Sequence, residues 1–279
     1  MYCQYYGFKE KPFNVTSDPA FFFLSRKHKE AIACMSYGIE QRKGIVTVTG
    51  EIGVGKTTLC RVLLTIMDKS VKTALVLNPY FSELQLLEFI VGDFGIKTKR
   101  KSRLDFVNEL NRFLINEYSL GNNAVIIIDE AQNLNIRQLE QVRLLSNLET
   151  AKEKLLQIIL VGQPELREKL ELPGLKQLKQ RVMVDYHIQP LDRNELKEYI
   201  VHRLKIAAGD NVKPVEFSDA AINKIYRFSC GIPRLVNLIC DRALLAAFTK
   251  EKNHICDAIT EECIKDITPK AGVAENLCA

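Results

Sequence analysis

The sequence predicts an α/β domain built on a parallel β-sheet, followed by a small all-helical domain. Short apolar runs alternate with helical patterns between residues 45 and 190, and only helical patterns follow from residue 191. A glycine-rich loop directly after the first apolar run is the third observation. At 279 residues and 47% hydrophobic, the chain can bury two cores. We expect an N-terminal segment and helix over 1–44 packed on the α/β domain of 45–190, a helical domain over 191–268 and a disordered tail over 269–279.

The first 24 residues are rich in aromatic side chains and are interrupted by Pro12 and Pro19. Proline restricts its own backbone and that of the residue before it, so we expect an extended segment here rather than a regular helix. From Ser25, which can cap a helix, apolar residues recur at helical spacing up to Gly44. The pattern therefore predicts one helix before the first strand.

The first apolar run, Ile45–Val48, leads into a complete G-x-x-x-x-G-K-[ST] pattern. The backbone N–H groups of such a loop and the positive end of the next helix point to one place, which suits a triphosphate. The glycines let the backbone approach phosphate, Lys56 can reach the β and γ phosphates, and Thr57 can offer its hydroxyl to Mg²⁺. The expected nucleotide-binding residues are Gly50, Glu51, Ile52, Gly53, Val54, Gly55, Lys56, Thr57 and Thr58. The aromatic N-terminal segment either lies beside the base of that nucleotide or only anchors the core.

The second apolar run, Thr73–Leu77, ends at Asn78. Because ligands bind at the C-terminal edge of parallel strands, Asn78 either contacts the nucleotide site or is a turn residue. Helical patterns follow on both sides of 97–103, which is the densest basic run in the chain. That run is either a contact for a nucleic-acid backbone or a solvated loop.

The third apolar run, Ala124–Ile128, predicts a strand buried on both faces, and Asp129 and Glu130 follow at its C-terminal end. This is the edge at which the phosphate-binding loop also lies. Asp129 can hold Mg²⁺ directly or through water, together with Thr57. Glu130 can polarise the water that attacks the γ-phosphate.

A fourth apolar run, Leu156–Val161, brings Gln163 to the same edge. Its amide can hydrogen-bond the γ-phosphate or the attacking water. Arg181 stands immediately before the last strand of the domain and can point toward a neighbouring subunit; Arg143 and Arg167 are the alternatives for that role. After residue 191, we expect helices over 193–208, 218–229, 233–250 and 257–267.

Composition gives limited information about the partners and the cellular location of the protein. The net charge of +5 neither requires nor excludes nucleic acid or an anionic membrane as a partner. The eight cysteines include no C-x-x-C pair and no spacing typical of a zinc site, so we expect reduced thiols and a cytoplasmic location. The N-terminus lacks a basic and apolar signal sequence, and no apolar run approaches the ~18–20 residues that span a bilayer, so we expect no direct membrane span.

Taken in order, these features resemble an AAA+ ATPase, in which a three-layer P-loop domain is followed by a helical lid. More narrowly, the sequence is similar to the ATPase domain of the ExeA (general secretion pathway protein A) family. The motifs that carry this similarity are Tyr6–Phe8, Pro12–Phe13, Asp18–Pro19, Phe23, His28, Gly50–Thr57, Ile128–Gln132, Leu144–Glu149, Ile159–Leu166 and Gly231–Arg234. Secretion members of that family continue into a membrane-spanning segment and a cell-wall-binding region, which this sequence lacks.

The resemblance implies a role for each matching position, with ATP and Mg²⁺ as cofactors. The implied roles are Walker A for Lys56 and Thr57, Walker B for Asp129 and Glu130, sensor 1 for Gln163, arginine finger for Arg181, sensor 2 for Arg234, and a restraint on Glu130 for Asn78. Arg234 begins a lid helix and would reach the γ-phosphate only when the lid closes. A finger supplied in trans makes hydrolysis depend on assembly, so we expect a homo-oligomer, either a ring or a filament.

Three functions fit these expectations. The first is ATP hydrolysis by an oligomer that supports assembly of a bacterial secretion or pilus-type envelope machine. The second is a transposition-type regulator that binds DNA in an ATP-dependent oligomer, for which the basic run 97–103 would supply contacts. The third is a nucleotide-gated binding module with little turnover, in which Glu130→Gln would hardly change phosphate release. The partner protein, the ring size and the process served stay open at this point.

Overall fold

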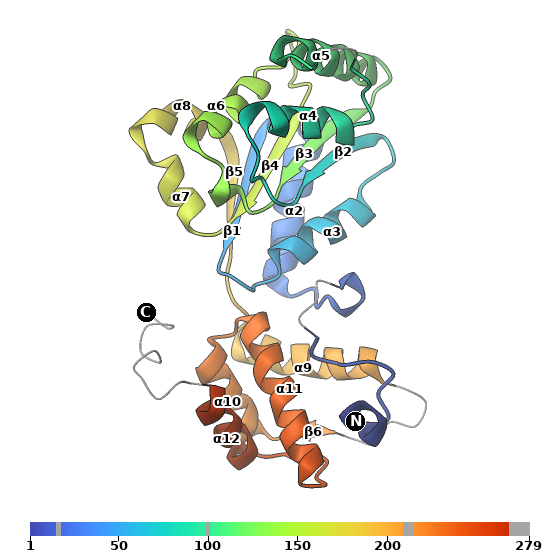
Figure 1. The fold of residues 1–279 in the computed structure, drawn as a ribbon, viewed down its shortest axis with the longest axis vertical. Coiled ribbons are helices and arrows are strands. Elements are labelled where there is room, and N and C mark those ends of the chain that lie inside the picture. Colours follow the sequence, from blue (N-terminus) through green and yellow to red (C-terminus); the bar gives the residue numbers. More distant parts are fainter. Residues whose placement is uncertain (15–17, 99–100, 209–214, 268–279) are drawn as a thin grey trace. The chain divides into compact units, whose positions relative to one another are not determined.

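A computed structural model describes residues 1–14, 18–98, 101–208 and 215–267 of the chain. The chain forms two compact units, and each is built from segments that are separate in the sequence. The first unit contains Met1–Ser25, Ile52–Gly55 and Gln189–Ala279, and the second contains Arg26–Glu51 and Lys56–Ile188. The second unit carries the central sheet, and the first is mainly helical (Figure 1).

The sheet of the second unit has five parallel strands in the order β2-β3-β4-β1-β5 (Figure 1). The strands are β1 (Ile45–Gly50), β2 (Val71–Val76), β3 (Asn123–Ile128), β4 (Gln157–Gly162) and β5 (Val182–Ile188). Because all five are parallel, their C-terminal ends lie along one edge, where loops that follow different strands can meet. The predicted parallel α/β domain is therefore confirmed.

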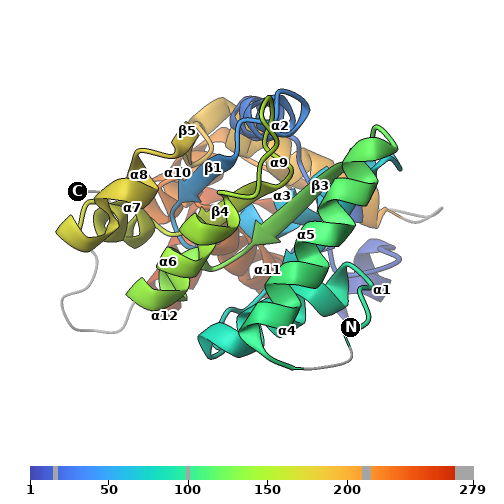
Figure 2. The same ribbon diagram turned by 90° about the horizontal axis from the view of Figure 1, so that it is seen from above.

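Helices lie on both faces of this sheet and give it three layers (Figure 1, Figure 2). They are α2 (Arg26–Glu40), α3 (Lys56–Ile66), α4 (Glu83–Asp93), α5 (Arg103–Ser119), α6 (Ile136–Leu145), α7 (Glu165–Leu170) and α8 (Lys176–Lys179), with the short 3₁₀ helices η2 (Ala131–Asn133) and η3 (Pro173–Leu175). Helix α2 contacts β1, β5 and α3, whereas α4, α5 and α6 contribute to the apolar core on the other face.

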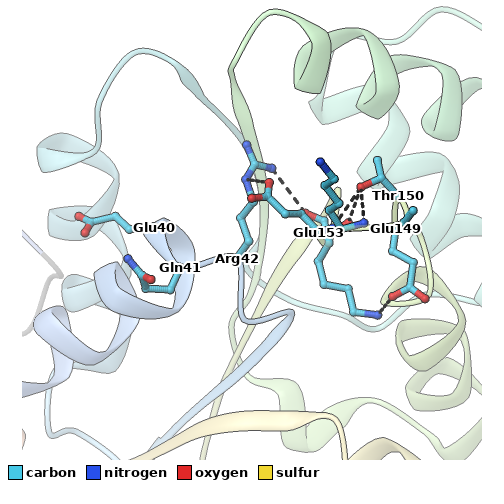
Figure 3. A pocket seen from close by; sticks show the side chains of 9 residues that line it. Glu40, Gln41, Arg42, Glu149, Thr150 and Glu153 are labelled. Atoms are coloured by element: carbon cyan, nitrogen blue, oxygen red, sulfur yellow. Dashed lines mark hydrogen bonds and ion pairs between the residues drawn. The ribbon is translucent and has the colours of Figure 1, made fainter.

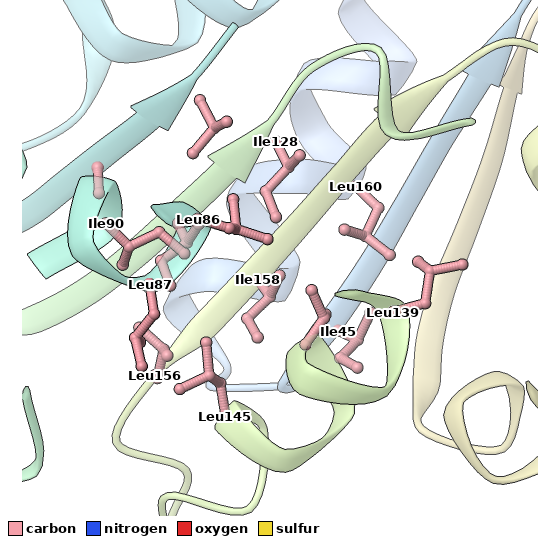
Figure 4. Packing of buried hydrophobic residues seen from close by; sticks show 14 of the residues in the cluster. Ile45, Leu86, Leu87, Ile90, Ile128, Leu139, Leu145, Leu156, Ile158 and Leu160 are labelled. Carbon is pink, nitrogen blue, oxygen red and sulfur yellow. The ribbon is translucent and has the colours of Figure 1, made fainter. Parts of the chain in front are cut away.

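Alternating side chains along each strand explain why both faces are apolar. Figure 4 shows one face, where strand residues meet α4 and α6; its labelled strand residues are Ile45, Ile128, Ile158 and Leu160, and Leu156 directly precedes β4. One residue further along β1, Val46 faces the opposite layer: a Cβ added to Gly38 of α2 would lie 2.3 Å from Val46 Cγ2. Such strands need apolar residues at every position, which is why the sequence shows continuous runs.

Helix α4, which follows β2, and helix α6, which follows β3, begin at capping boxes. Ser82 starts α4 and Asn135 starts α6, each paired with the side chain of a glutamine three residues later. The second of these glutamines, Gln138, is buried and also donates to the carbonyls of Pro79 and Phe81 at 3.3 and 2.8 Å. The loop after β2 is thereby tied to α6.

The first unit is built from α1 (Tyr2–Tyr6), η1 (Pro19–Phe21), α9 (Arg193–Ala207), α10 (Asp219–Ser229), α11 (Pro233–Thr249) and α12 (Asp257–Ile267), with the short parallel pair β6 (Glu216–Phe217) and β7 (His254–Ile255). Helices α10, α11 and α12 pack against one another. The four helices expected after residue 191 are therefore present, and the strand pair was not expected.

The N-terminal segment differs from the expectation in two ways. Residues 2–6 do form a short helix, because the first proline comes only at position 12. The aromatic segment also packs with the helices of the first unit and not on the sheet. Tyr6 Oη donates to the carbonyl of Lys252 at 2.9 Å, and buried Arg203 donates to the carbonyl of Pro12 at 2.6 Å. These rings fill the helical core of the first unit, whereas α2 packs on the sheet of the second.

Six cysteines carry free thiols: Cys3, Cys34, Cys60, Cys240, Cys256 and Cys263. Cys230 is disulfide-bonded, so the expectation of reduced thiols is wrong at that position. Within the described ranges, no helix combines the length and the apolar character that a membrane crossing requires.

Candidate nucleotide-binding site

The phosphate-binding loop connects the end of β1 at Gly50 to the start of α3 at Lys56. Gly53 and Gly55 adopt φ angles of +89° and +100°, a region that L side chains rarely occupy. The glycines at these two positions are therefore required by the backbone itself. The first backbone N–H groups of α3 have no partner inside the helix and are available to an anion.

Lys56 is folded back onto the loop that precedes it. Its ammonium donates to the carbonyl of Gly50 at 2.7 Å and to the carbonyl of Glu51 at 2.9 Å, and the residue is only 6% exposed. Burial lowers the pKa of Lys56, and the carboxylates of Glu130 and Asp129 oppose that shift. The loop thus keeps a cation next to the place where phosphate oxygens are expected.

The loop and the end of β3 meet through Thr57 and Asp129. The Thr57 hydroxyl donates to Asp129 Oδ2 at 2.5 Å, and Asp129 Oδ1 accepts the backbone N–H of Glu130 at 2.9 Å. Asp129 is 1% exposed, and burial raises the pKa of its carboxyl while the Thr57 hydroxyl opposes the shift. The structure brings together the two residues that the sequence marked as metal ligands.

Glu130 is held by two glutamines. Its backbone is left-handed at φ +52°, and its Oε2 accepts the side-chain amide of Gln132 at 2.6 Å and that of Gln163 at 3.2 Å. The backbone N–H of Gln163 donates to Gln132 Oε1 at 3.1 Å. Gln163 therefore lies where the sequence placed it. Gln132 was not singled out, although it ends the Ile128–Gln132 motif.

The side chain of Asn78 makes no hydrogen bond to Glu130. Within the ranges that the structure describes, its side chain is exposed and forms no hydrogen bond or ion pair. Strand β2 ends at Val76, and the next two residues turn to solvent before buried Pro79 anchors the loop to α6. Strand β2 itself ends beside the acidic pair, because the backbone N–H of Asp129 donates to the carbonyl of Val76 at 2.8 Å, and the role implied for Asn78 stays a prediction.

The three candidate arginines differ in what they already bind. Arg143 forms two hydrogen bonds to Glu140, at 2.8 and 2.6 Å, and Arg167 donates to Asp185 at 2.8 Å. The side chain of Arg181 is half-buried and makes no hydrogen bond or ion pair to any described residue. Arg181 is therefore the candidate whose guanidinium has no competing carboxylate bond, and its role stays a prediction.

Two further expectations concern residues away from the acidic pair. Arg234 is exposed on α11 in the first unit, where its backbone N–H donates to the carbonyl of Gly53, of the same unit, at 3.3 Å. Its sensor role stays a prediction. Lys99 and Arg100 of the basic run lie outside the described residues, and Lys101 forms an ion pair with Glu88 at 2.6 Å. The nucleic-acid contact expected for 97–103 is therefore not established.

A polar pocket of about 430 Å³ lies at the other edge of the sheet (Figure 3). Its walls come from residues 40–42, which precede β1, and residues 149–154, which precede β4. Two ion pairs lie along its walls: Arg42 binds Glu153 at 3.2 Å, and Lys154 binds Glu149. This pocket is separate from the loop that follows β1.

The residues at the loop and the acidic pair suit Mg²⁺. No described part of the chain gathers three or more His, Cys, Asp or Glu side chains that could enclose a metal ion. Mg²⁺ does not need such a cage, because it keeps several waters and is usually held by one or two carboxylates and the phosphates of its substrate. One hydroxyl and one buried carboxylate, in direct contact, match that requirement.

Similarity to known proteins agrees with this site. The AAA domain family matches residues 39–170. General secretion pathway protein A of Aeromonas hydrophila is 41% identical over 256 residues, which is 91% of this chain and 46% of that protein. The chain thus spans about half the length of this relative.

Solved structures resemble the fold at low sequence identity. The ORC2 protein of Aeropyrum pernix, in ADPNP–ADP complexes, has a TM-score of 0.65 at 17% identity and covers 93% of this chain and 72% of its own. Cdc6p of Pyrobaculum aerophilum has a TM-score of 0.68 at 16% identity, and the match covers 91% of this chain and 72% of Cdc6p. The Holliday junction branch migration motor RuvB of Thermotoga maritima has a TM-score of 0.56 at 18% identity, and the match covers 87% of this chain and 69% of RuvB. These likenesses concern the fold, and together with the AAA domain match they show that the chain is similar to AAA+ proteins and, over most of its length, to general secretion pathway protein A.

Proposed function

We propose that the chain binds ATP with Mg²⁺ and hydrolyses it at the loop between β1 and α3. The observation that carries this proposal is the 2.5 Å hydrogen bond between Thr57 and buried Asp129, with Glu130 as the next residue. A hydroxyl at the start of the loop helix and a carboxylate at a strand end meet for few reasons other than a shared metal ion.

Different residues of the chain bind the phosphates, hold the metal and activate the water. Backbone N–H groups of the loop bind phosphate oxygens, and Thr57 and Asp129 hold the metal. Mg²⁺, when bound there, neutralises charge on the β and γ phosphates. Glu130 accepts a proton from the attacking water, and Gln163 donates to the γ-phosphate or orients that water.

Lys56 must change partners for this to happen. In the ligand-free structure its ammonium is satisfied by two loop carbonyls at 2.7 and 2.9 Å. Phosphate oxygens carry full negative charge and make stronger, charge-assisted bonds than carbonyls do. We expect nucleotide binding to turn Lys56 from the carbonyls to the β and γ phosphates.

Glu130→Gln tests the hydrolytic step. The change removes the base and keeps the size of the side chain, so turnover should fall ~10²–10⁴-fold while nucleotide binding persists. Phosphate release measures turnover, and a fluorescent ATP analogue measures binding. Unchanged phosphate release in the variant would mean that the chain is a nucleotide-gated binding module with another role for Glu130.

A second arm of the same experiment addresses assembly. We infer a homo-oligomer in which Arg181 acts on the nucleotide of a neighbouring subunit, because Arg143 and Arg167 are already bound to carboxylates. If so, Glu130→Gln and Arg181→Ala subunits, each inactive alone, should regain turnover when mixed. No recovery on mixing would place the finger elsewhere or make it act within one subunit.

The process served is inferred from the relative that covers most of this chain. Its name, general secretion pathway protein A, supports a role in secretion, and we propose that the chain uses ATP in the cytoplasm to support assembly of a secretion or pilus-type envelope machine. A purified secretion or pilus component that stimulates turnover would support this role. Stimulation by duplex DNA, lost steeply with added salt, would instead favour a transposition-type regulator.

A further inference from the structure

The side chain of Gln132 contacts Glu130 and lies outside the residues to which a role has been assigned so far. Gln132 Nε2 donates to Glu130 Oε2 at 2.6 Å, a shorter bond than the one from Gln163 at 3.2 Å. We propose that Gln132 is a positioning residue that aims the Glu130 carboxylate at the attacking water. This inference rests on the proposed function, in which Glu130 is the base.

The hydrogen bonds fix which way the Gln132 amide faces. Its Nε2 donates to a carboxylate oxygen, and its Oε1 accepts the backbone N–H of Gln163 at 3.1 Å. A rotated amide would place its oxygen against the carboxylate of Glu130 and its NH₂ against the N–H of Gln163, and both contacts would be repulsive. Both ends of the amide are therefore used, and the side chain has one favourable orientation.

Residues of β4 and α7 leave space for Gln132 and bind its backbone. A Cβ added to Gly162, the last residue of β4, would lie 2.9 Å from Gln132 Oε1 and 3.3 Å from Gln132 N. Glycine at this strand end thus leaves the space that the amide occupies. From α7, Lys169 donates to the carbonyl of Gln132 and, at 3.0 Å, to that of Leu134. The loop after β3 is held in place by β4 and α7 independently of the Glu130 bond.

The consequence for Glu130 concerns its two oxygens. Both glutamine amides donate to Oε2, and Oε1 accepts no hydrogen bond from any described residue. Two donors on one oxygen fix the rotation of the carboxylate and leave the other oxygen available for a water proton.

Two variants test the proposal. Gln132→Glu keeps the shape and the acceptor for Gln163 but replaces the donor to Glu130 with a like charge, and Gln132→Met removes both bonds. Turnover should fall ~100-fold in each, the loss expected when a catalytic group is displaced by about 1 Å, with the affinity for the ATP analogue unchanged. Gln41→Glu, an exposed glutamine at the opposite edge of the sheet, is the matched control for the added charge. Thermal unfolding of every variant reports on folding.

A double-variant cycle separates positioning from a general structural role. If Gln132 acts through Glu130, then Gln132→Met should cause no further loss of turnover in a Glu130→Gln background. A further ~100-fold loss there, or equal turnover of Gln132→Met and the wild type, would overturn the proposal while leaving Glu130 as the base. A Glu130→Gln variant with full turnover would overturn the proposed function, and this inference with it.

Discussion

Lys56→Met removes the ammonium from the phosphate-binding loop and keeps most of the apolar stem. In the ligand-free protein the change has two opposing effects. It relieves the cost of a buried cation, but it leaves the carbonyls of Gly50 and Glu51 without the donor at 2.7 and 2.9 Å. We therefore expect a small change in the stability of the empty protein and a large change in its response to ATP.

The size of that response follows from binding linkage. At an ATP concentration of about 100 times the wild-type Kd, binding stabilises the native state by ~2.7 kcal/mol. One charge-assisted hydrogen bond to phosphate contributes ~1.5–3 kcal/mol, so its loss weakens binding ~10–150-fold. At the same ATP concentration the variant then gains only ~0.3–1.4 kcal/mol. At roughly 2–4 °C per kcal/mol, the ATP-induced rise in Tm falls from ~5–11 °C to ~1–6 °C.

Thermal unfolding with and without Mg-ATP measures the stability of the protein without nucleotide and its ATP-induced rise in Tm in one series. Lys69→Met is the matched control, because Lys69 is an exposed lysine in the segment between α3 and β2. The control should keep the full ATP-induced rise in Tm. Should Lys56→Met keep it as well, Lys56 does not bind phosphate, and the assignment of the loop as the nucleotide site is refuted.

Gly231→Ala should destabilise the first unit by at least ~2 kcal/mol, because φ is +77° and the new Cβ would lie 1.9 Å from the carbonyl oxygen of Leu191; an unchanged urea midpoint would contradict the geometry. Cys256 should be alkylated faster than Cys60 at pH 7. The backbone N–H groups of Ile259 and Ala258 lower the thiol pKa of Cys256, so its thiolate persists to lower pH, whereas complete burial raises the pKa of Cys60. Mass spectrometry after brief iodoacetamide treatment would decide, and preferential labelling of Cys60 would refute this order.

Much of the fold could be predicted from the sequence because parallel strands buried on both faces require uninterrupted apolar runs. The run Ala124–Ile128 accordingly matches β3, Asn123–Ile128, to within one residue. The start of the second strand was placed two residues late, since Lys72 interrupts the apolar run after Val71 and both residues join β2 by pairing with β3. Such pairing depends on the partner strand, which periodicity along one segment does not report.

The candidate site was predictable where one motif or one strand end fixes the position of a side chain. Thr57, Asp129 and Gln163 fall into this class, because parallel topology alone brings their strand ends to one edge. The contacts of Gln132 and the exposure of Asn78 were not predictable in this way. The contact of Gln132 depends on the rotation of an amide between β3 and β4, and the exposure of Asn78 depends on how α6 holds the loop that follows it.

The side chains of the site hydrogen-bond to one another and to the loop, and this limits how nucleotide can bind. Lys56 is satisfied by loop carbonyls, Thr57 by Asp129, and Glu130 by two glutamines. A Mg-nucleotide must therefore exchange bonds of Lys56 and Thr57, and only the difference between old and new bonds contributes to affinity. The bonds of Glu130 need no such exchange, because both glutamines occupy Oε2 and Oε1 faces no described donor. Binding thus rearranges the loop residues while the base is already oriented, so changes at Lys56 should act mainly on affinity and changes at Gln132 mainly on turnover.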